Sequence, residues 1–260
     1  MTSTRRQALH WLGCTDPAAT ARGVRALDPA APVDAHEAIA EPPGIPGRPA
    51  RPRLVAHTQL RSRSAYTPQG RAALLHALAH IELNAIDLAL DIVWRFAGMP
   101  EAFYRQWLGV AREEALHFEL LRDHLGTLGR RYGDFDAHDG LWQMAERTRH
   151  DVLARLALVP RTLEARGLDA SPAVKAKLLA AGDGRGGEIL DLILRDEVGH
   201  VAIGNRWFRW LCKRDGSDPL VAYAELARRH HAPRLRGPFN VEARLAAGFT
   251  HVEVDALSRN

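Results

Sequence analysis

The sequence predicts an all-α protein, a four-helix bundle with accessory helices near both ends of the chain. Apolar residues recur at helical spacing along four long segments. No run of alternating apolar and polar residues is long enough to build a sheet. With 46% hydrophobic and 25% charged residues, the composition is that of a folded globular protein, which excludes wholesale disorder.

The first 64 residues are expected to form two short helices and a proline-rich arm. The helices are predicted at 5–14 and 17–27, and Asp16 with Pro17 is a favourable start for the second. The segment 41–53 contains five prolines and two glycines, so it cannot be a helix or a central strand. It is predicted to be an ordered wrap or a linker.

Residues 65–214 are expected to form the bundle. Thr67 caps a first long helix at 68–96, and Gly98-Met99-Pro100 separates it from a second at 100–128. A third is predicted at 141–167 with a kink at Pro160, a short helix follows Ser171-Pro172, and a fourth spans 188–213. Residues 215–260 are expected to pack on the bundle as a helix at 219–229 and an irregular tail.

Two Glu-x-x-His segments carry the candidate chemistry. Glu114 and His117 lie in the second long helix, and Glu197 and His200 lie in the fourth. Residues three apart share a helix face, so each pair can reach one metal ion. One such pair is weak evidence, but two pairs on separate long helices are much less expected by chance.

Four-helix carboxylate sites also use one single glutamate from each remaining helix. Glu82 fits the first helix, because Gly98 is midway between 82 and 114 and a hairpin folded there brings both residues to one height. Glu164 fits the third helix, since 33 residues separate it from Glu197 and 32 separate Glu82 from Glu114. Its alignment requires 172–181 to prolong the third helix, and Glu146 is the alternative.

Acidic residues precede both paired glutamates, namely Glu113 and Asp196. Metal-bound histidines usually donate their second ring N–H to a carboxylate, which fixes the tautomer and the ring orientation. Asp196 and Glu113 are predicted in that supporting role, and a solvated surface glutamate is the equal alternative for Glu113. Four carboxylates and two imidazoles without thiolates favour two ions, iron with iron or manganese with iron.

At these residues the chain resembles the ferritin-like di-iron carboxylate superfamily, which includes ribonucleotide reductase small subunits, multicomponent monooxygenases and rubrerythrins. The form Asp196-Glu197-x-x-His200 is especially similar to the reductase and monooxygenase type. The chain is identified as a member of a bacterial ferritin-like family that is catalogued as a domain of unknown function. The segments that carry this resemblance are HIELNAIDLALD (from His80), HDGLWQMAERT (from His138), LEARGLD (from Leu163), DEVGHVAIGNRWF (from Asp196) and RGPFN (from Arg236).

The resemblance implies a fold and a metal site, but no substrate. An O2-dependent oxidase or hydroxylase acting on a small molecule is the first hypothesis, with an electron-donor protein as a further partner. Iron storage is the second, and a helical interaction protein whose acids pair with arginines is the third. The family is itself similar to an iron-dependent hydroxylase of a modified tRNA adenosine, so a tRNA partner is a weaker alternative. A homodimer is compatible with all of these.

Charge and cysteine content bound the remaining possibilities. The net charge is +4, and 32 of the 35 basic residues are arginines, which favour phosphate recognition but are spread along the chain. Cys14 and Cys212 are too few for a disulfide scaffold. No apolar run has the length of a membrane span, and no signal sequence is evident, so a cytoplasmic protein without membrane contact is expected.

Overall fold

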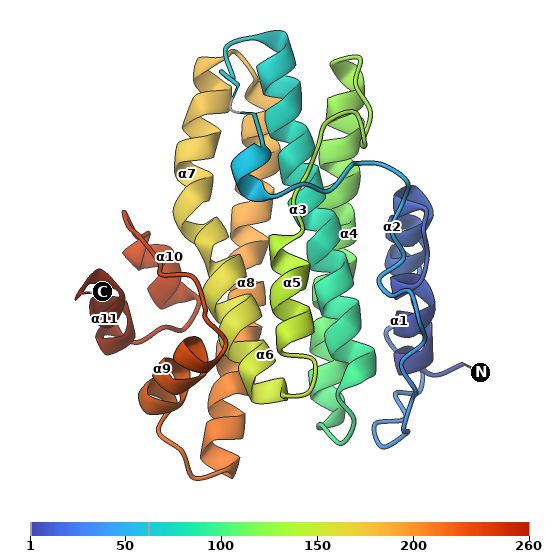
Figure 1. The fold of residues 1–260 in the computed structure, drawn as a ribbon, viewed down its shortest axis with the longest axis vertical. Helices are drawn as coiled ribbons and strands as arrows, with labels where there is room; N and C mark the ends of the chain where they lie inside the picture. Colours follow the sequence, from blue (N-terminus) through green and yellow to red (C-terminus); the bar gives the residue numbers. More distant parts are fainter. Residues whose placement is uncertain (1, 62, 260) are drawn as a thin grey trace. The chain divides into compact units, whose positions relative to one another are not determined.

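The computed structural model describes residues 2–61 and 63–259, and over these residues the chain is all-α, as predicted (Figure 1). An isolated parallel bridge between Leu54 and Ala137 is the β pairing found in this part of the chain. The helices are α1 (Thr4–Leu12), α2 (Pro17–Arg25), η1 (His57–Gln59), α3 (Pro68–Arg95), α4 (Glu101–Thr127), α5 (Gly140–Arg147), α6 (Val152–Leu158), the π-helical η2 (Val159–Glu164), α7 (Ala165–Ala180), α8 (Gly184–Arg214), α9 (Pro219–Arg229), α10 (Val241–Ala246) and α11 (His251–Arg259).

The chain forms two compact units. Unit 1 comprises residues 1–142 and 178–189, and unit 2 comprises residues 143–177 and 190–260. The four long helical paths needed for a bundle are all present: α3 and α4 belong to unit 1, and α6–η2–α7 and α8 belong mainly to unit 2. The three-part division at 64/65 and 214/215 stays a prediction.

In unit 1, α3 and α4 form an antiparallel pair, and α1 and α2 lie along it (Figure 1). The Thr67 side chain accepts a hydrogen bond from the Gly70 N–H at 3.0 Å and caps α3. Gly98 turns the chain with φ +79°, a conformation that favours glycine. The Tyr104 hydroxyl donates to the Phe96 carbonyl at 2.7 Å and fastens this turn to α4. The hairpin therefore folds where the sequence predicts.

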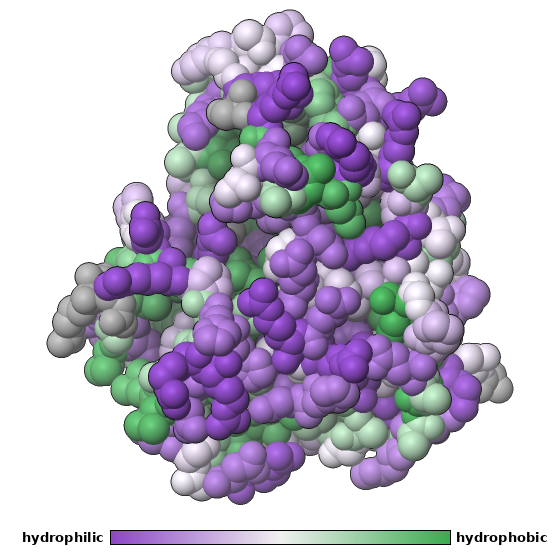
Figure 2. All heavy atoms as spheres, viewed as in Figure 1, coloured by the Kyte–Doolittle hydropathy of each residue, from purple (hydrophilic) through white to green (hydrophobic). Residues whose placement is uncertain are grey.

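The middle of α3 is buried on every side, and each residue from Glu82 to Trp94 is buried. Among the described helices, α3 is long and apolar enough to span a membrane, but 72% of the tested window is buried inside the protein. On the face shown in Figure 2, hydrophilic residues predominate and hydrophobic ones form separate patches. We therefore treat α3 as the core helix of unit 1.

The N-terminal helices and the proline-rich arm are tied to the rest of unit 1. The buried Arg5 guanidinium donates to the Trp94 carbonyl at 2.6 Å, at the end of α3. In the arm, the Gly47 N–H donates to the Leu12 carbonyl at 2.7 Å, and Arg48 forms an ion pair with Asp139 at 2.7 Å. Of the two predicted alternatives for the arm, the structure shows the ordered wrap.

The predicted continuous third helix is wrong, because the chain breaks after α5 and restarts at Asp151, whose side chain accepts from the Ala154 N–H at 2.9 Å. At Pro160, where a kink is predicted, the chain forms the π-helical segment Val159–Glu164. The separate helix after Ser171-Pro172 is also wrong, since α7 continues through Pro172. Proline leaves the carbonyl four residues earlier without its helical donor, and the Asn240 side chain supplies one to Leu168 at 3.1 Å.

The fourth helix begins four residues earlier than predicted. The Asp183 side chain accepts from the Gly186 N–H at 2.8 Å, which stabilises a first turn rich in glycine. The C-terminal tail is not irregular throughout, because it contains the helices α10 and α11. They complete a core of unit 2 whose buried members are Ala165, Leu168, Val201, Ala247, Phe249 and Val254.

Candidate metal centre

Three of the predicted ligands meet in the interior of unit 1. Glu82 from α3 and Glu114 and His117 from α4 each offer one ligand atom, and these atoms lie within 4.8 Å of one another. The side chains are almost completely buried, with exposed fractions of 3%, 1% and 0%. The hairpin at Gly98 thus brings Glu82 and Glu114 together as their spacing indicates, while their role as ligands stays a prediction.

The His117 imidazole lies between the two carboxylates. Its Nδ1 atom is 3.2 Å from Oε2 of Glu114 and 3.3 Å from Oε2 of Glu82. Burial lowers the pKa of His117, but the close contacts with Glu114 and Glu82 and their negative charges outweigh it and raise this pKa to about 11. Burial, followed by the charge of Glu114, raises the pKa of Glu82. A proton or a bound cation can balance the charge of these buried carboxylates.

A proton on His117 balances only part of that charge, since two carboxylates share it. Oε2 of Glu82 is buried and makes no hydrogen bond of regular geometry within the described residues. Two carboxylates and one imidazole are a donor set that divalent iron or manganese accepts readily. The residues present thus fit a divalent metal ion.

The other predicted ligands lie in unit 2. Glu197 and His200 are buried on α8, with exposed fractions of 8% and 1%. Glu164 is the last residue of the π-helical segment and is half-buried, with its Oε2 atom inaccessible to solvent. Because α7 continues from Ala165 to Ala180 through Pro172, the condition set for Glu164 is met. Within the described residues, Glu164 does not join Glu197 and His200 in a group as close as that of unit 1.

The alternative and supporting acids differ in exposure. Glu146 is exposed on α5, which favours Glu164 over it as the third-helix candidate. Glu113 is exposed on α4, in agreement with a solvated surface glutamate. Asp196 is 14% exposed and pairs with Arg195 at 2.8 Å, so its predicted support of His200 stays a prediction.

The helical pattern of 68–96 does not set apart His76 and His80, two further histidines of α3. Both are buried, and burial lowers the pKa of His76 to about 4 and that of His80 to about 3. Nδ1 of His80 lies 2.7 Å from the Tyr132 hydroxyl, and the Gly133 N–H donates to His76 at 2.9 Å. The partners belong to the loop after α4, which no spacing along α3 reveals. These neutral histidines therefore attach that loop to α3.

Fold and site together define a class: an all-α protein whose buried glutamates and histidine could hold a metal ion. Residues 13–255 match the family described as "Protein of unknown function (DUF455)", and the chain belongs to that family.

A protein of Haemophilus influenzae, named only "Uncharacterized protein", is 50% identical over 214 residues, which cover 80% of this chain and 74% of that protein. No solved structure matches the chain. The comparisons thus confirm the predicted family and leave the ferritin-like and di-iron assignment to be tested.

Proposed function

We propose that the protein is a ferritin-like dinuclear metal protein, with two irons as the preferred pair, that acts as an O2-dependent oxidase or hydroxylase. The observation that carries the proposal is the buried group of Glu82, Glu114 and His117. An isolated buried carboxylate is costly, and two beside one imidazole are costlier still unless a cation joins them. A metal ion supplies that cation.

The second ion of the proposal rests on the sequence pattern. Unit 2 contains a second Glu-x-x-His pair, Glu197 and His200, and a single candidate carboxylate, Glu164. The full set of four glutamates and two histidines is the one that four-helix di-iron and di-manganese proteins use. Manganese with iron is the alternative pair, because the same ligands suit both metals.

When bound, two reduced irons supply the electrons that activate O2. The residues of this chain hold and shield the site. Glu82 and Glu114 provide negative charge on a fixed hairpin, and the His117 imidazole must give up its proton to become a ligand. The burial of all three side chains keeps bulk water away from these groups.

The test is anaerobic loading with iron(II), followed by exposure to O2, on a matched pair of variants. Glu114→Gln removes a buried carboxylate, whereas Glu113→Gln removes the exposed carboxylate beside it on the same helix. We expect Glu113→Gln to bind iron and consume O2 like the wild type and Glu114→Gln to do neither. Equal iron binding and O2 consumption by both variants would refute the assignment.

Iron storage is distinguished by stoichiometry in the same experiment. A discrete oxidase holds about two irons per chain, whereas a storage protein takes up many more as iron(II) and O2 are added repeatedly. The tRNA alternative predicts hydroxylation of a modified adenosine by the loaded protein, read by mass spectrometry of tRNA nucleosides.

A further inference from the structure

A cavity in unit 2 lies between α7 and the segment that connects α9 to α10. Its volume is about 390 Å³, and residues 233–239 form one wall, with Arg166, Ala170 and Ala173 on the other. Together with Val241 and Leu257, the same segment also lines a second hollow. This segment contains the RGPFN sequence that the proposed metal chemistry does not use.

Three arginines line the cavity and have no acidic partner. Arg166, Arg234 and Arg236 are exposed, and no carboxylate of the described residues lies within ion-pair distance of any of them. Many arginines elsewhere in the chain do form such pairs, for example Arg25 with Glu119 and Arg95 with Asp91. Three unpaired guanidinium groups around one hollow create a positive field.

One acid, Asp169, lines the cavity, and its charge is already neutralised. Its Oδ2 accepts from Nη2 of Arg244 at 2.6 Å, and its Oδ1 accepts from Nε of Arg244 at 3.0 Å and from the Asn240 N–H at 2.9 Å. Arg244 is completely buried, and its Cζ atom lies 5.2 Å from the centroid of the Phe239 ring. Arg244 and Asp169 thus form a neutral pair, and the three exposed arginines keep their positive charge.

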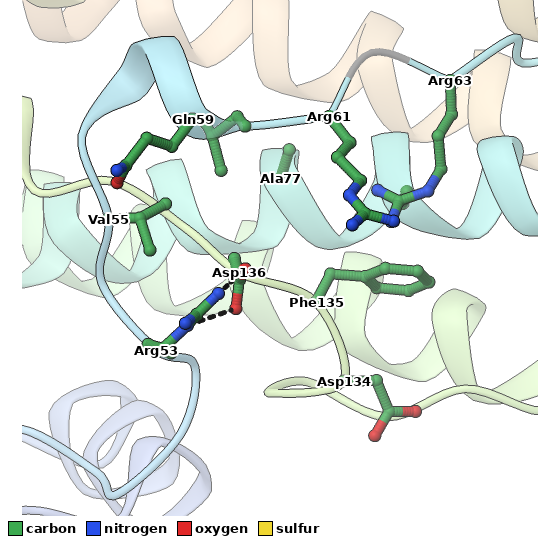
Figure 3. A pocket seen from close by; sticks show the side chains of 11 residues that line it. Arg53, Val55, Gln59, Arg61, Arg63, Ala77, Asp134, Phe135 and Asp136 are labelled. Atoms are coloured by element: carbon green, nitrogen blue, oxygen red, sulfur yellow. Dashed lines mark hydrogen bonds and ion pairs between the residues drawn. The ribbon is translucent and has the colours of Figure 1, made fainter.

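A second arginine-lined cavity, in unit 1, has most of its positive charge offset by acids. Its volume is about 480 Å³, and its lining includes Arg53, Arg61 and Arg63. Arg53 forms a two-fold ion pair with Asp136, and Asp134 lies in the same lining (Figure 3). Two carboxylates thus oppose three arginines there, whereas the cavity of unit 2 keeps its positive charge.

We propose that the cavity of unit 2 binds a phosphate monoester that carries an apolar or aromatic group. Arginine forks match phosphate oxygens in pairs, and such charge-assisted hydrogen bonds are among the strongest in proteins. The apolar group would lie against Ala170, Ala173 and Leu235, which supply the wall between the arginines. This site is independent of the proposed metal centre.

Phenyl phosphate is the probe, and isothermal titration calorimetry on the metal-free full chain is the measurement. We expect saturable binding that is weakened about tenfold or more by Arg234→Gln and by Arg236→Gln. Arg228→Gln is the matched control, because Arg228 is an exposed arginine that does not line the cavity. Thermal unfolding of each variant checks that the fold is unchanged.

Titrations with inorganic phosphate and with phenol show which part of the probe the cavity binds. Inorganic phosphate should bind more weakly than phenyl phosphate, and phenol should not bind. Absence of phenyl phosphate binding at millimolar concentration, or equal weakening by Arg228→Gln, would overturn the proposal. Arginine-dependent binding of a short single-stranded RNA without any binding of phenyl phosphate would also overturn it and make the cavity part of a nucleic-acid surface.

Discussion

The two Glu-x-x-His segments have the same sequence pattern but different structural settings. Glu114 and His117 lie in an unbroken helix, and their partner Glu82 comes from a helix joined to it by one tight turn. Glu197 and His200 also lie in an unbroken helix, but Glu164 ends a π-helical segment that begins at Val159. Unit 1 therefore forms its group by simple hairpin geometry, whereas the candidate Glu164 of unit 2 lies on a local irregularity of the backbone.

This difference suggests that the two groups are not equivalent. π-Helical turns inside α-helices occur frequently at functional sites, where they change the direction of one side chain. The segment of unit 2 is held by hydrogen bonds from Thr162 to the Ala157 carbonyl at 2.8 Å and from Arg161 to Asn205. Because the ligand atoms of Glu82, Glu114 and His117 already lie within 4.8 Å of one another, we expect the group of unit 1 to bind a metal ion more tightly.

The largest predicted effect comes from two variants, each of which disrupts one of the two candidate groups. Glu114→Gln should remove tight metal binding altogether, because it takes a carboxylate from the complete group of unit 1. Glu197→Gln should keep about one metal ion per chain. Elemental analysis after desalting measures both, and Glu188→Gln on the exposed side of α8 is the control. Metal retained in Glu114→Gln and lost in Glu197→Gln would reverse the comparison.

The packing of the π-helical segment gives the next prediction. A Cβ on Gly204 would lie 2.7 Å from Cβ of Pro160, whose ring cannot move aside, while a Cβ on Gly199 would meet nothing within 4 Å. Gly204→Ala should cost about 1–3 kcal/mol of unfolding free energy in urea. Gly199→Ala should be neutral or stabilising by up to about 1 kcal/mol. Equal stability of both variants would remove this contact from the account.

The pH dependence of metal binding tests the charge balance of unit 1. Since the pKa of His117 is raised to about 11, its ring holds a proton at neutral pH, and metal binding must release that proton. Apparent affinity should therefore rise with pH, by up to about tenfold per pH unit for one released proton. Calorimetry in buffers of different ionisation enthalpy counts the protons. No proton release between pH 6 and 8 would show that His117 is not protonated in the metal-free protein.

The smallest predicted effect concerns α7. Asn240→Ala should destabilise the chain by about 1 kcal/mol, because the Leu168 carbonyl and the Ala243 N–H both lose a hydrogen bond to its side chain. Urea unfolding of the metal-free protein measures this cost. Asn240→Asp keeps the cap of α10 but cannot donate to Leu168. Its stability should lie between that of the wild type and that of Asn240→Ala. A stability unchanged in both would contradict the explanation for the continuous helix at Pro172.

Local signals predicted the parts of the fold that local interactions determine. The cap at Thr67, the turn at Gly98 and the meeting of Glu82 with Glu114 all follow from helical spacing and turn chemistry. The continuation of α7 through Pro172 could not be predicted, since the rescuing donor is Asn240, far along the chain. The burial of His76 and His80 likewise depends on a loop that the helical pattern does not describe.

The most direct test of the central claim is the metal content of the wild-type chain after anaerobic reconstitution with iron(II) and manganese(II) and desalting. The account predicts about two metal ions per chain, magnetically coupled to each other in electron paramagnetic resonance or Mössbauer spectra. A chain that retains no metal, or only a trace, would contradict it. The buried acids and histidines would then be structural ion pairs of a helical interaction protein.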